Sequence, residues 1–145
     1  MASYEFVVDI DAPREQVFAL WTNLDRMSEW IGGVQDVVDR VGPVAQAGSS
    51  YVVRFGSWAK SPTTVIAAEQ PVRYATRFGN SYLRGENEAT FEDVHGRTRL
   101  KQTFRIHGLL PRLMARIFAT GSYKGSFRGE LNHFKSICER EARGA

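Results

Sequence analysis

The chain opens with strict alternation of apolar and polar residues. The apolar positions of this first segment are Tyr4, Phe6, Val8 and Ile10. A period of two predicts a strand with one buried face. From residue 11 the apolar period lengthens to that of a helix, with Pro13 and acidic residues near its start. We predict two short helices, over residues 11–24 and 25–33, the second of which ends at Gly32 and Gly33.

Glycine and proline divide residues 34–107 into short segments of alternating hydrophobicity. Six such segments are predicted, and their spacing is typical of consecutive antiparallel strands. The clearest of them place apolar side chains on one face and charged side chains on the other, as in RLKQTFRIH at residues 99–107. The positions predicted to share the apolar face are Tyr51, Val53, Phe55, Tyr74, Thr76, Phe78, Leu100, Gln102, Phe104 and Ile106.

A helical period returns from about Pro111 to Arg140. The apolar stripe of this segment would cover the apolar face of the predicted sheet. Because the chain contains no internal repeat, low-complexity segment or linker, we predict a single domain that spans residues 1–145. The predicted class is therefore α+β, with about seven antiparallel strands, two short helices after the first strand and one long C-terminal helix.

Three glycines interrupt the long helical segment at four-residue spacing: Gly121, Gly125 and Gly129. Each weakens a helix by about 1 kcal/mol relative to alanine. Another backbone could pack closely along this line, the helix could bend at Gly121, or the missing side chains could leave a space opposite the sheet. Lys124 falls near the centre of the apolar face, where its amine needs either an acidic or carbonyl partner or a path to water.

The order of the elements resembles the helix-grip fold of the START-like superfamily, which includes the Bet v 1-type proteins. More narrowly, the chain resembles the polyketide cyclase/dehydrase and lipid-transport family. The segments that carry this resemblance are IDAPREQVFALWTNLDRMSEW, AAEQPVRYATRF, HGRTRLKQTFRI and the closing LNHFKSICERE. The resemblance implies a curved sheet wrapped around the C-terminal helix, with an apolar cavity between them. It implies no catalytic residue, because the family has no universal catalytic motif.

The candidate ligand-binding residues are those that such a cavity would expose. Asn87 and Gln102 carry amide groups whose partners could be a bound ligand, a neighbouring side chain, water or the backbone. The aromatic residues could form part of the core or provide stacking surfaces for a planar ligand. The full predicted set is Trp30, Tyr51, Phe55, Tyr74, Phe78, Asn87, Phe91, Gln102, Phe104, Phe118, Gly121, Lys124 and Gly125.

The sequence gives little support to metal or nucleophile chemistry. Glu130 and His133 have the Glu-x-x-His spacing of some metal sites, but the helical period places both on the polar side of the helix. Cys138, the only cysteine, lies on the apolar side and is interpreted as a small core residue. The chain has neither a P-loop nor a dinucleotide-binding fingerprint, so no metal and no cofactor are predicted.

Charge is distributed unevenly along the chain, which has a net charge of +3. Residues 1–96 contain 8 basic and 13 acidic residues, whereas residues 97–145 contain 11 and 3. The basic part could attract an acidic protein such as an acyl carrier protein, or contact a membrane surface through Arg112 and Arg116. The alternative is a solvated surface without a partner. No nucleic-acid-binding motif is present, so nucleic acid is not a predicted partner.

The beginning of the chain lacks the basic and apolar regions of a secretory leader, and no apolar run approaches the length needed to span a bilayer. These features predict a cytoplasmic protein without a transmembrane segment.

Three functions follow from these patterns. The leading prediction is a protein that binds a small hydrophobic molecule, such as a lipid, a quinone or a polyketide-like compound, as a carrier or sensor. The first alternative is an aromatic polyketide cyclase or dehydratase, in which Lys124 or an arginine stabilises an enolate and a tyrosine or carboxylate moves a proton. The second alternative is a protein- or membrane-interaction module that uses the basic C-terminal part.

Overall fold

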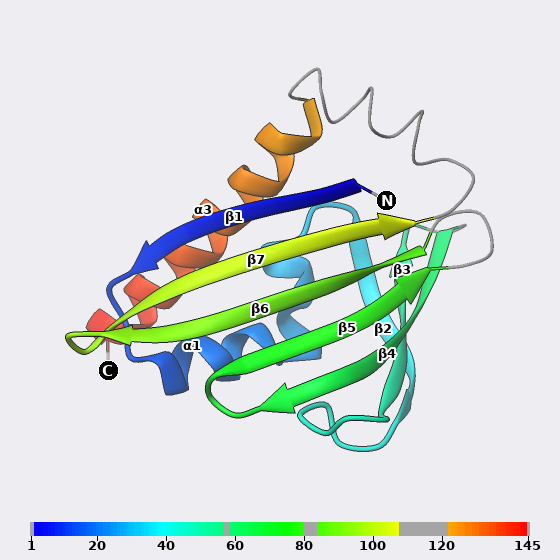
Figure 1. Ribbon diagram of the computed structural model, residues 1–145, viewed down its shortest axis with the longest axis horizontal. Coiled ribbons are helices and arrows are strands. Elements are labelled where there is room, and N and C mark those ends of the chain that lie inside the picture. The colour runs from blue at the N-terminus through cyan, green and yellow to red at the C-terminus, as the bar shows by residue number, and fades with distance from the viewer. Residues whose placement is uncertain (1, 57–58, 80–83, 108–121, 145) are drawn as a thin grey trace.

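The computed structural model describes residues 2–56, 59–79, 84–107 and 122–144 (Figure 1). Its seven strands are β1 (Ala2–Ile10), β2 (Val34–Val41), β3 (Ser50–Phe55), β4 (Ala59–Glu69), β5 (Arg73–Gly79), β6 (Arg84–Val94) and β7 (Arg97–His107). Its helices are α1 (Arg14–Trp21), the 3₁₀ helix η1 (Leu24–Glu29) and α3 (Ser122–Gly144).

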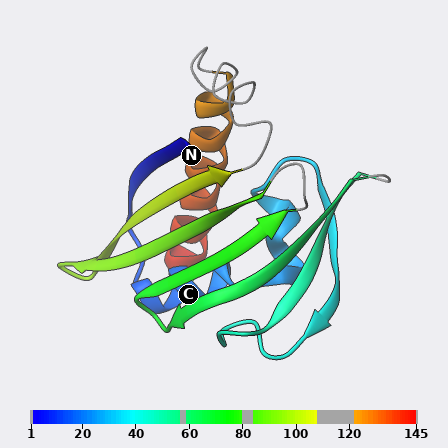
Figure 2. The same ribbon diagram turned by 45° about the vertical axis from the view of Figure 1, so that its right-hand side comes forward.

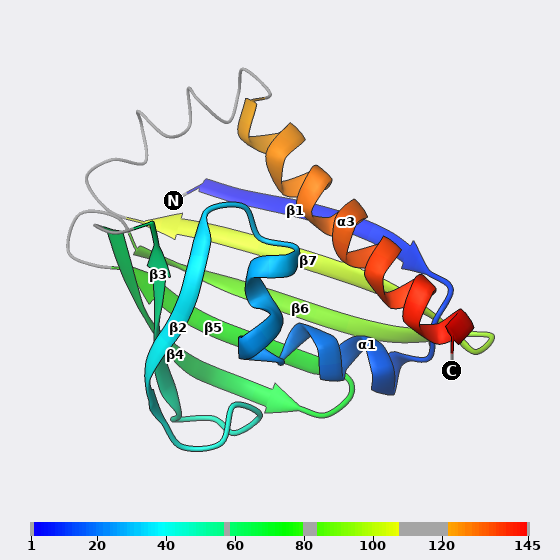
Figure 3. The same cartoon turned by 180° about the vertical axis from the view of Figure 1, so that it is seen from behind.

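The seven strands form one antiparallel sheet in the order β1-β7-β6-β5-β4-β3-β2. The sheet curves, and the helices lie on its inner side (Figures 2 and 3). We call this inner side the concave face and the opposite side the convex face. The predicted seven-stranded antiparallel sheet with a C-terminal helix is therefore confirmed.

The pairing register decides which side chains share the concave face. One row of directly paired positions crosses four strands, from Thr76 on β5 through Asn87 on β6 and Phe104 on β7 to Tyr4 on β1. Positions directly opposite each other point to the same face of a sheet. The inward positions predicted from the alternation pattern therefore lie together on the concave face.

Aromatic side chains form the centre of the core, where α1, η1 and α3 meet the sheet. Phe134 of α3 packs edge-on against Trp21 and Trp30, with ring centroids 5.2 and 5.1 Å apart. Phe18 of α1 packs in the same way against Phe91 of β6, at 5.3 Å. Edge-to-face pairs of this kind contribute about 0.5–1.5 kcal/mol each beyond the area that they bury.

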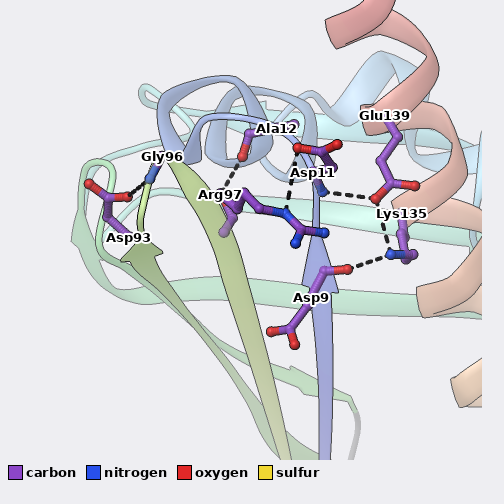
Figure 4. Close-up of polar contacts among 9 residues, drawn as sticks. Asp9, Asp11, Ala12, Asp93, Gly96, Arg97, Lys135 and Glu139 are labelled. Carbon is purple, nitrogen blue, oxygen red and sulfur yellow. Dashed lines mark hydrogen bonds and ion pairs between the residues drawn. The ribbon is translucent and has the colours of Figure 1, made fainter.

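Polar contacts attach the C-terminal half of α3 to the end of β1 (Figure 4). The Nζ of Lys135 donates to the backbone oxygen of Asp9 at 2.6 Å, and to Oε2 of Glu139 at 3.0 Å. The same Glu139 oxygen accepts a hydrogen bond from the backbone nitrogen of Asp11 at 2.8 Å. Helix and strand are thus joined through backbone groups as well as through apolar packing.

The two short helices differ from the predicted ones at their boundaries. The first begins at Arg14, with Pro13 as its N-cap. The second is a 3₁₀ helix that ends at Glu29, before the two glycines that were predicted to end it. Arg26 within it forms an ion pair with Glu141 of α3, and this contact fixes the short helix against the long one.

No helix among the described residues is long and apolar enough to cross a membrane.

Candidate functional site

The aromatic side chains at one end of the concave face are only partly covered. Phe55, Phe78 and Phe104, near the C-terminal ends of β3, β5 and β7, are half-buried, whereas Phe91 at the other end is fully buried in the core. The rings of Phe78 and Phe104 meet edge to face, with centroids 6.3 Å apart. We call the region of Phe55, Phe78 and Phe104 the aromatic end.

Gly85 allows the ring of Phe78 to lie close to β6. The two residues are directly opposite each other in the register of β5 and β6. A Cβ atom at position 85 would overlap the backbone oxygen of Arg105 and would stand 3.0 Å from the Phe78 ring. The absence of a side chain at Gly85 is therefore a requirement of the aromatic end.

Next to the aromatic end, two amide side chains form a hydrogen-bonded pair. Gln102 Nε2 donates to Asn87 Oδ1 at 3.2 Å. Gln102 is buried, with 7% of its surface exposed, and Asn87 is half-buried. This bond leaves Gln102 Oε1 as an acceptor and Asn87 Nδ2 as a donor for other partners. We call Asn87 and Gln102 the amide pair.

Two buried tyrosines lie farther along the concave face. The Tyr74 hydroxyl donates to the backbone oxygen of Val44 at 2.9 Å. Burial raises the pKa of Tyr51 to about 12, and burial together with the neighbouring Tyr51 raises the pKa of Tyr74 well above its usual value. Both phenols therefore stay protonated near neutral pH and can serve as hydrogen-bonding groups.

The strand positions that surround the amide pair on the concave face are uncharged. These positions are Thr63, Val65, Thr76, Phe78, Gly85, Ala89, Phe91, Leu100, Phe104 and Ile106. Charged residues of the same strands form cross-strand ion pairs on the convex face, such as Arg77 with Glu86 and Arg73 with Glu88. Within this part of the sheet, polarity on the concave face comes from amides and hydroxyls.

Glu130 of α3 lies differently from the prediction. Its Oε1 accepts a hydrogen bond from the backbone nitrogen of Gly32 at 3.3 Å, and its side chain is half-buried. Burial raises the pKa of this carboxyl group to about 7. The placement on the polar side was wrong because Glu130 lies one turn before Phe134 and shares its direction toward the segment after η1. His133 is exposed, as predicted.

The Glu130 carboxyl group is close to Phe55, the member of the aromatic end on β3. Gly32 donates the hydrogen bond to Glu130, and the next residue, Gly33, lies against Phe55. A Cβ atom built on Gly33 would be 3.8 Å from the Phe55 ring. Glu130 is thus a titratable group at the border between α3 and the aromatic end, and the sequence analysis did not select it.

The predicted site residues separate into three groups. Phe78, Asn87, Gln102 and Phe104 lie together. Phe55 lies two strands from Phe78, opposite Ala59 rather than Thr63 of β4. A second group is buried in or beside the core: Trp30, Tyr51, Tyr74 and Phe91. A third group was predicted on the long helix: Phe118 and Gly121 lie outside the described residues, as do the side-chain surroundings of Lys124 and Gly125 in α3.

Gly129 is the one glycine of the four-residue series whose surroundings are described. It is exposed, and a Cβ atom built on it would meet no atom within 4 Å. Close approach of another backbone therefore does not explain the glycine at this position.

A groove that the sequence did not predict lies between the α1–η1 junction and the connection from β2 to β3. Its volume is about 470 Å³, and its wall includes Thr22, Ser49 and Tyr51. At its border Arg40 pairs with Asp25 at 2.7 Å. Neither in this groove nor elsewhere in the described part of the chain could a group of three or more His, Cys, Asp or Glu side chains hold a metal ion.

The sequence of the chain matches a known protein family. The sequence model of the family described as polyketide cyclase / dehydrase and lipid transport matches residues 1–139. The chain belongs to this family. Membership and fold fit a protein that binds hydrophobic ligands or acts like a polyketide cyclase, as the resemblance implied.

Solved structures confirm the helix-grip fold of this family member. Mesorhizobium loti MLL2253 is 14% identical with a TM-score of 0.75, and the alignment covers 96% of this chain and 98% of that one. Ara h 8.0201 is 15% identical with a TM-score of 0.67, and the alignment covers 93% of this chain and 98% of that one. DynU16, a protein from the dynemicin biosynthetic locus, is 18% identical with a TM-score of 0.71; the alignment covers 97% of this chain but spans about half (48%) of DynU16. No curated protein sequence matches the chain.

Proposed function

We propose that this protein binds a small hydrophobic molecule between the concave face of the sheet and α3, and acts as a carrier or sensor of that molecule. The ligand class includes lipids, quinones and polyketide-like aromatic compounds. The observation that carries the proposal is the aromatic end, where Phe55, Phe78 and Phe104 face inward but stay half-buried next to the amide pair.

Apolar surface that faces inward without being fully covered provides the driving force for such binding. Removing it from water contributes roughly 25 cal/mol for each Å². Ligand sites typically combine a mainly apolar lining with a few polar groups that orient the ligand. Phe78 and Phe104 provide the first component, and Asn87 and Gln102 provide the second.

The ionisation of the buried groups favours carriage over nucleophilic chemistry. Burial raises the pKa of Cys138 to about 12, so its thiol is not ionised near neutral pH. Tyr51 and Tyr74 also keep their protons, as their raised pKa values require. A carrier needs burial and orientation, and these residues are suited to both.

Native mass spectrometry of the freshly purified protein tests the proposal directly. We expect a retained mass of a small organic molecule, and stabilisation in thermal-shift screens of lipids, quinones and polyketide-like aromatics. A ligand at 100 times its Kd stabilises the folded state by about 2.7 kcal/mol. Replacing Phe104 with alanine should weaken the response, whereas the same change at exposed Asn132 should not. Wild-type protein that retains no mass and responds to no compound would contradict the proposal.

A second function, the cyclisation or dehydration of an enclosed poly-ketone chain, is favoured by Glu130. A carboxyl group with a pKa of about 7 can give or take a proton near neutral pH, and Glu130 borders the aromatic end. If this function is correct, Glu130→Gln should abolish conversion of a poly-ketone probe and leave its binding unchanged. Bound probe that is recovered unaltered from wild-type protein would contradict catalysis and leave carriage.

A further inference from the structure

The amide pair offers one acceptor and one donor to a ligand at the aromatic end. Gln102 Nε2 and Asn87 Oδ1 bond to each other at 3.2 Å, which leaves Gln102 Oε1 and Asn87 Nδ2 for other partners. A ligand carbonyl can accept from Asn87 Nδ2, and a ligand hydroxyl can donate to Gln102 Oε1. A molecule that carries both groups near each other would satisfy the two amides together.

The neighbouring side chains fit a planar or unsaturated skeleton. Asn87 is directly opposite Phe104 in the register of β6 and β7, and the Phe104 ring meets Phe78 edge to face. Aromatic rings prefer offset-stacked or edge-to-face neighbours, and both rings here are half-buried. A ring of a ligand can therefore contact the accessible part of Phe78 beside the amide pair.

The same region does not suit an ionised group. The strand positions around the amide pair on the concave face carry apolar, hydroxyl or amide side chains. Burying a carboxylate without a cationic partner costs several kcal/mol, whereas a ketone or phenol can be satisfied by an amide. On the sheet side, the site therefore favours neutral over charged ligands of equal size.

We propose that the amide pair and the aromatic end select an uncharged, ring-containing ligand that carries a carbonyl and a hydroxyl group, in preference to a fatty acid or another carboxylate. This inference rests on the proposed function and specifies its ligand class. Asn87 and Gln102 are its specificity-determining residues.

Three probes with the same ring skeleton test the selection. They are 2-(hydroxymethyl)anthraquinone (the hydroxyquinone), whose hydroxyl group is free to donate, anthracene, and anthraquinone-2-carboxylate. Titration calorimetry or fluorescence gives the Kd of each. We expect the hydroxyquinone to bind wild-type protein at least about tenfold more tightly than either of the others, which is the effect of one well-placed hydrogen bond. In Gln102→Leu the preference of the hydroxyquinone over anthracene should disappear, while the Kd of anthracene stays unchanged.

Thr103→Val is the matched control, because Thr103 is adjacent on β7 and points to the opposite face. It should leave all three Kd values unchanged. Thermal unfolding without ligand checks that each variant is folded. If Gln102→Leu is not folded, Asn87→Leu at the half-buried member of the pair provides the same test.

Several outcomes would overturn the inference. Carboxylate binding as tight as that of the hydroxyquinone would do so, and would indicate a cationic group opposite the amide pair. An equal loss for all three probes in Gln102→Leu would assign the residue a general structural role. If none of the three probes binds but the purified protein retains a lipid with an acyl chain, the inference is overturned and the proposed function stands. If the protein retains no molecule and binds none, the proposed function is overturned as well.

Discussion

Two glycines of this protein have opposite surroundings. Gly85 lies beneath the Phe78 ring and beside the backbone oxygen of Arg105, so a side chain there has no room. Gly129 lies in α3, where an added Cβ atom would have no other atom within 4 Å. The same residue type thus shapes the aromatic end at one position and only weakens a helix at the other.

Alanine substitutions at these two glycines should change stability in opposite directions. Gly85→Ala should destabilise the fold by about 1–3 kcal/mol, because the new methyl group forces the strand backbone or the Phe78 ring to move. Gly129→Ala should stabilise it by about 0.5–1 kcal/mol, because the helix gains propensity without a clash. Urea denaturation measures both. Destabilisation by Gly129→Ala would show that this glycine has a role that its surroundings do not reveal.

Glu130 gives the fold a specific pH dependence. Its folded-state pKa of about 7 exceeds the ordinary glutamate value of 4.5, so the folded protein binds this proton at pH values where the unfolded chain has released it. Its contribution to stability is fully present below about pH 4.5 and is lost as the pH rises through 7. The shift bounds the loss at roughly 3 kcal/mol, and because the side chain is partly exposed we expect about 1 kcal/mol.

The variant Glu130→Gln isolates this contribution, because glutamine resembles the protonated carboxyl group and can still accept from Gly32. The variant and the wild type should be about equally stable near pH 4.5, and the variant should be more stable at about pH 8. Denaturant titrations at the two pH values measure the difference. If the difference in unfolding free energy between wild type and variant is the same at both pH values, Glu130 titrates as a solvated carboxyl group.

At the scale of elements, α3 is fixed through its C-terminal half. Phe134 contacts both Trp21 of α1 and Trp30 beyond η1, while Lys135 bonds to the backbone of β1. One side chain therefore connects three helical elements to each other over the sheet. The packing of the helical layer depends more on this ring than on the exposed ion pairs around it.

Phe134→Ala should cost about 3–5 kcal/mol of unfolding free energy, because a fully buried ring is removed from contact with two tryptophans. Asn132→Ala, at an exposed position two residues earlier, should change stability by less than about 0.5 kcal/mol. Chemical denaturation followed by tryptophan fluorescence measures both. A loss below about 1 kcal/mol at Phe134 would mean that the tryptophans pack without it.

Local periodicity predicted the sheet well and the helix surface less well. Alternation in β3, β5 and β7 identified which residues share the concave face, because the two faces of a strand depend only on the pleat. It could not tell how far along that face each residue lies, so Phe91 and Phe104 were grouped together although one is in the core and the other at the aromatic end. Glu130 was misplaced because its surroundings depend on where α3 meets Gly32, a contact between residues 98 positions apart.

At the scale of the whole molecule, the uneven charge along the chain becomes local pairing on the convex face. Basic β7 lies between β1 and β6, which carry acidic residues. Arg99 pairs with Asp9 at 2.9 Å, and Lys101 pairs with Glu5 at 3.4 Å. Much of the basic charge of this strand is therefore matched within the sheet. Binding of an acidic protein or a membrane remains a hypothesis that would depend on other basic residues.

The contacts at the end of β1 also bear on self-association. β1 and β2 are the two outer strands of the sheet, and unpaired backbone groups on outer strands invite a strand from a second molecule. The Asp9 carbonyl is already bonded to Lys135, and β2 is interrupted by register shifts. The bonded carbonyl at one border and the irregular pairing at the other make each a less regular template for fibril growth than an uninterrupted strand would be.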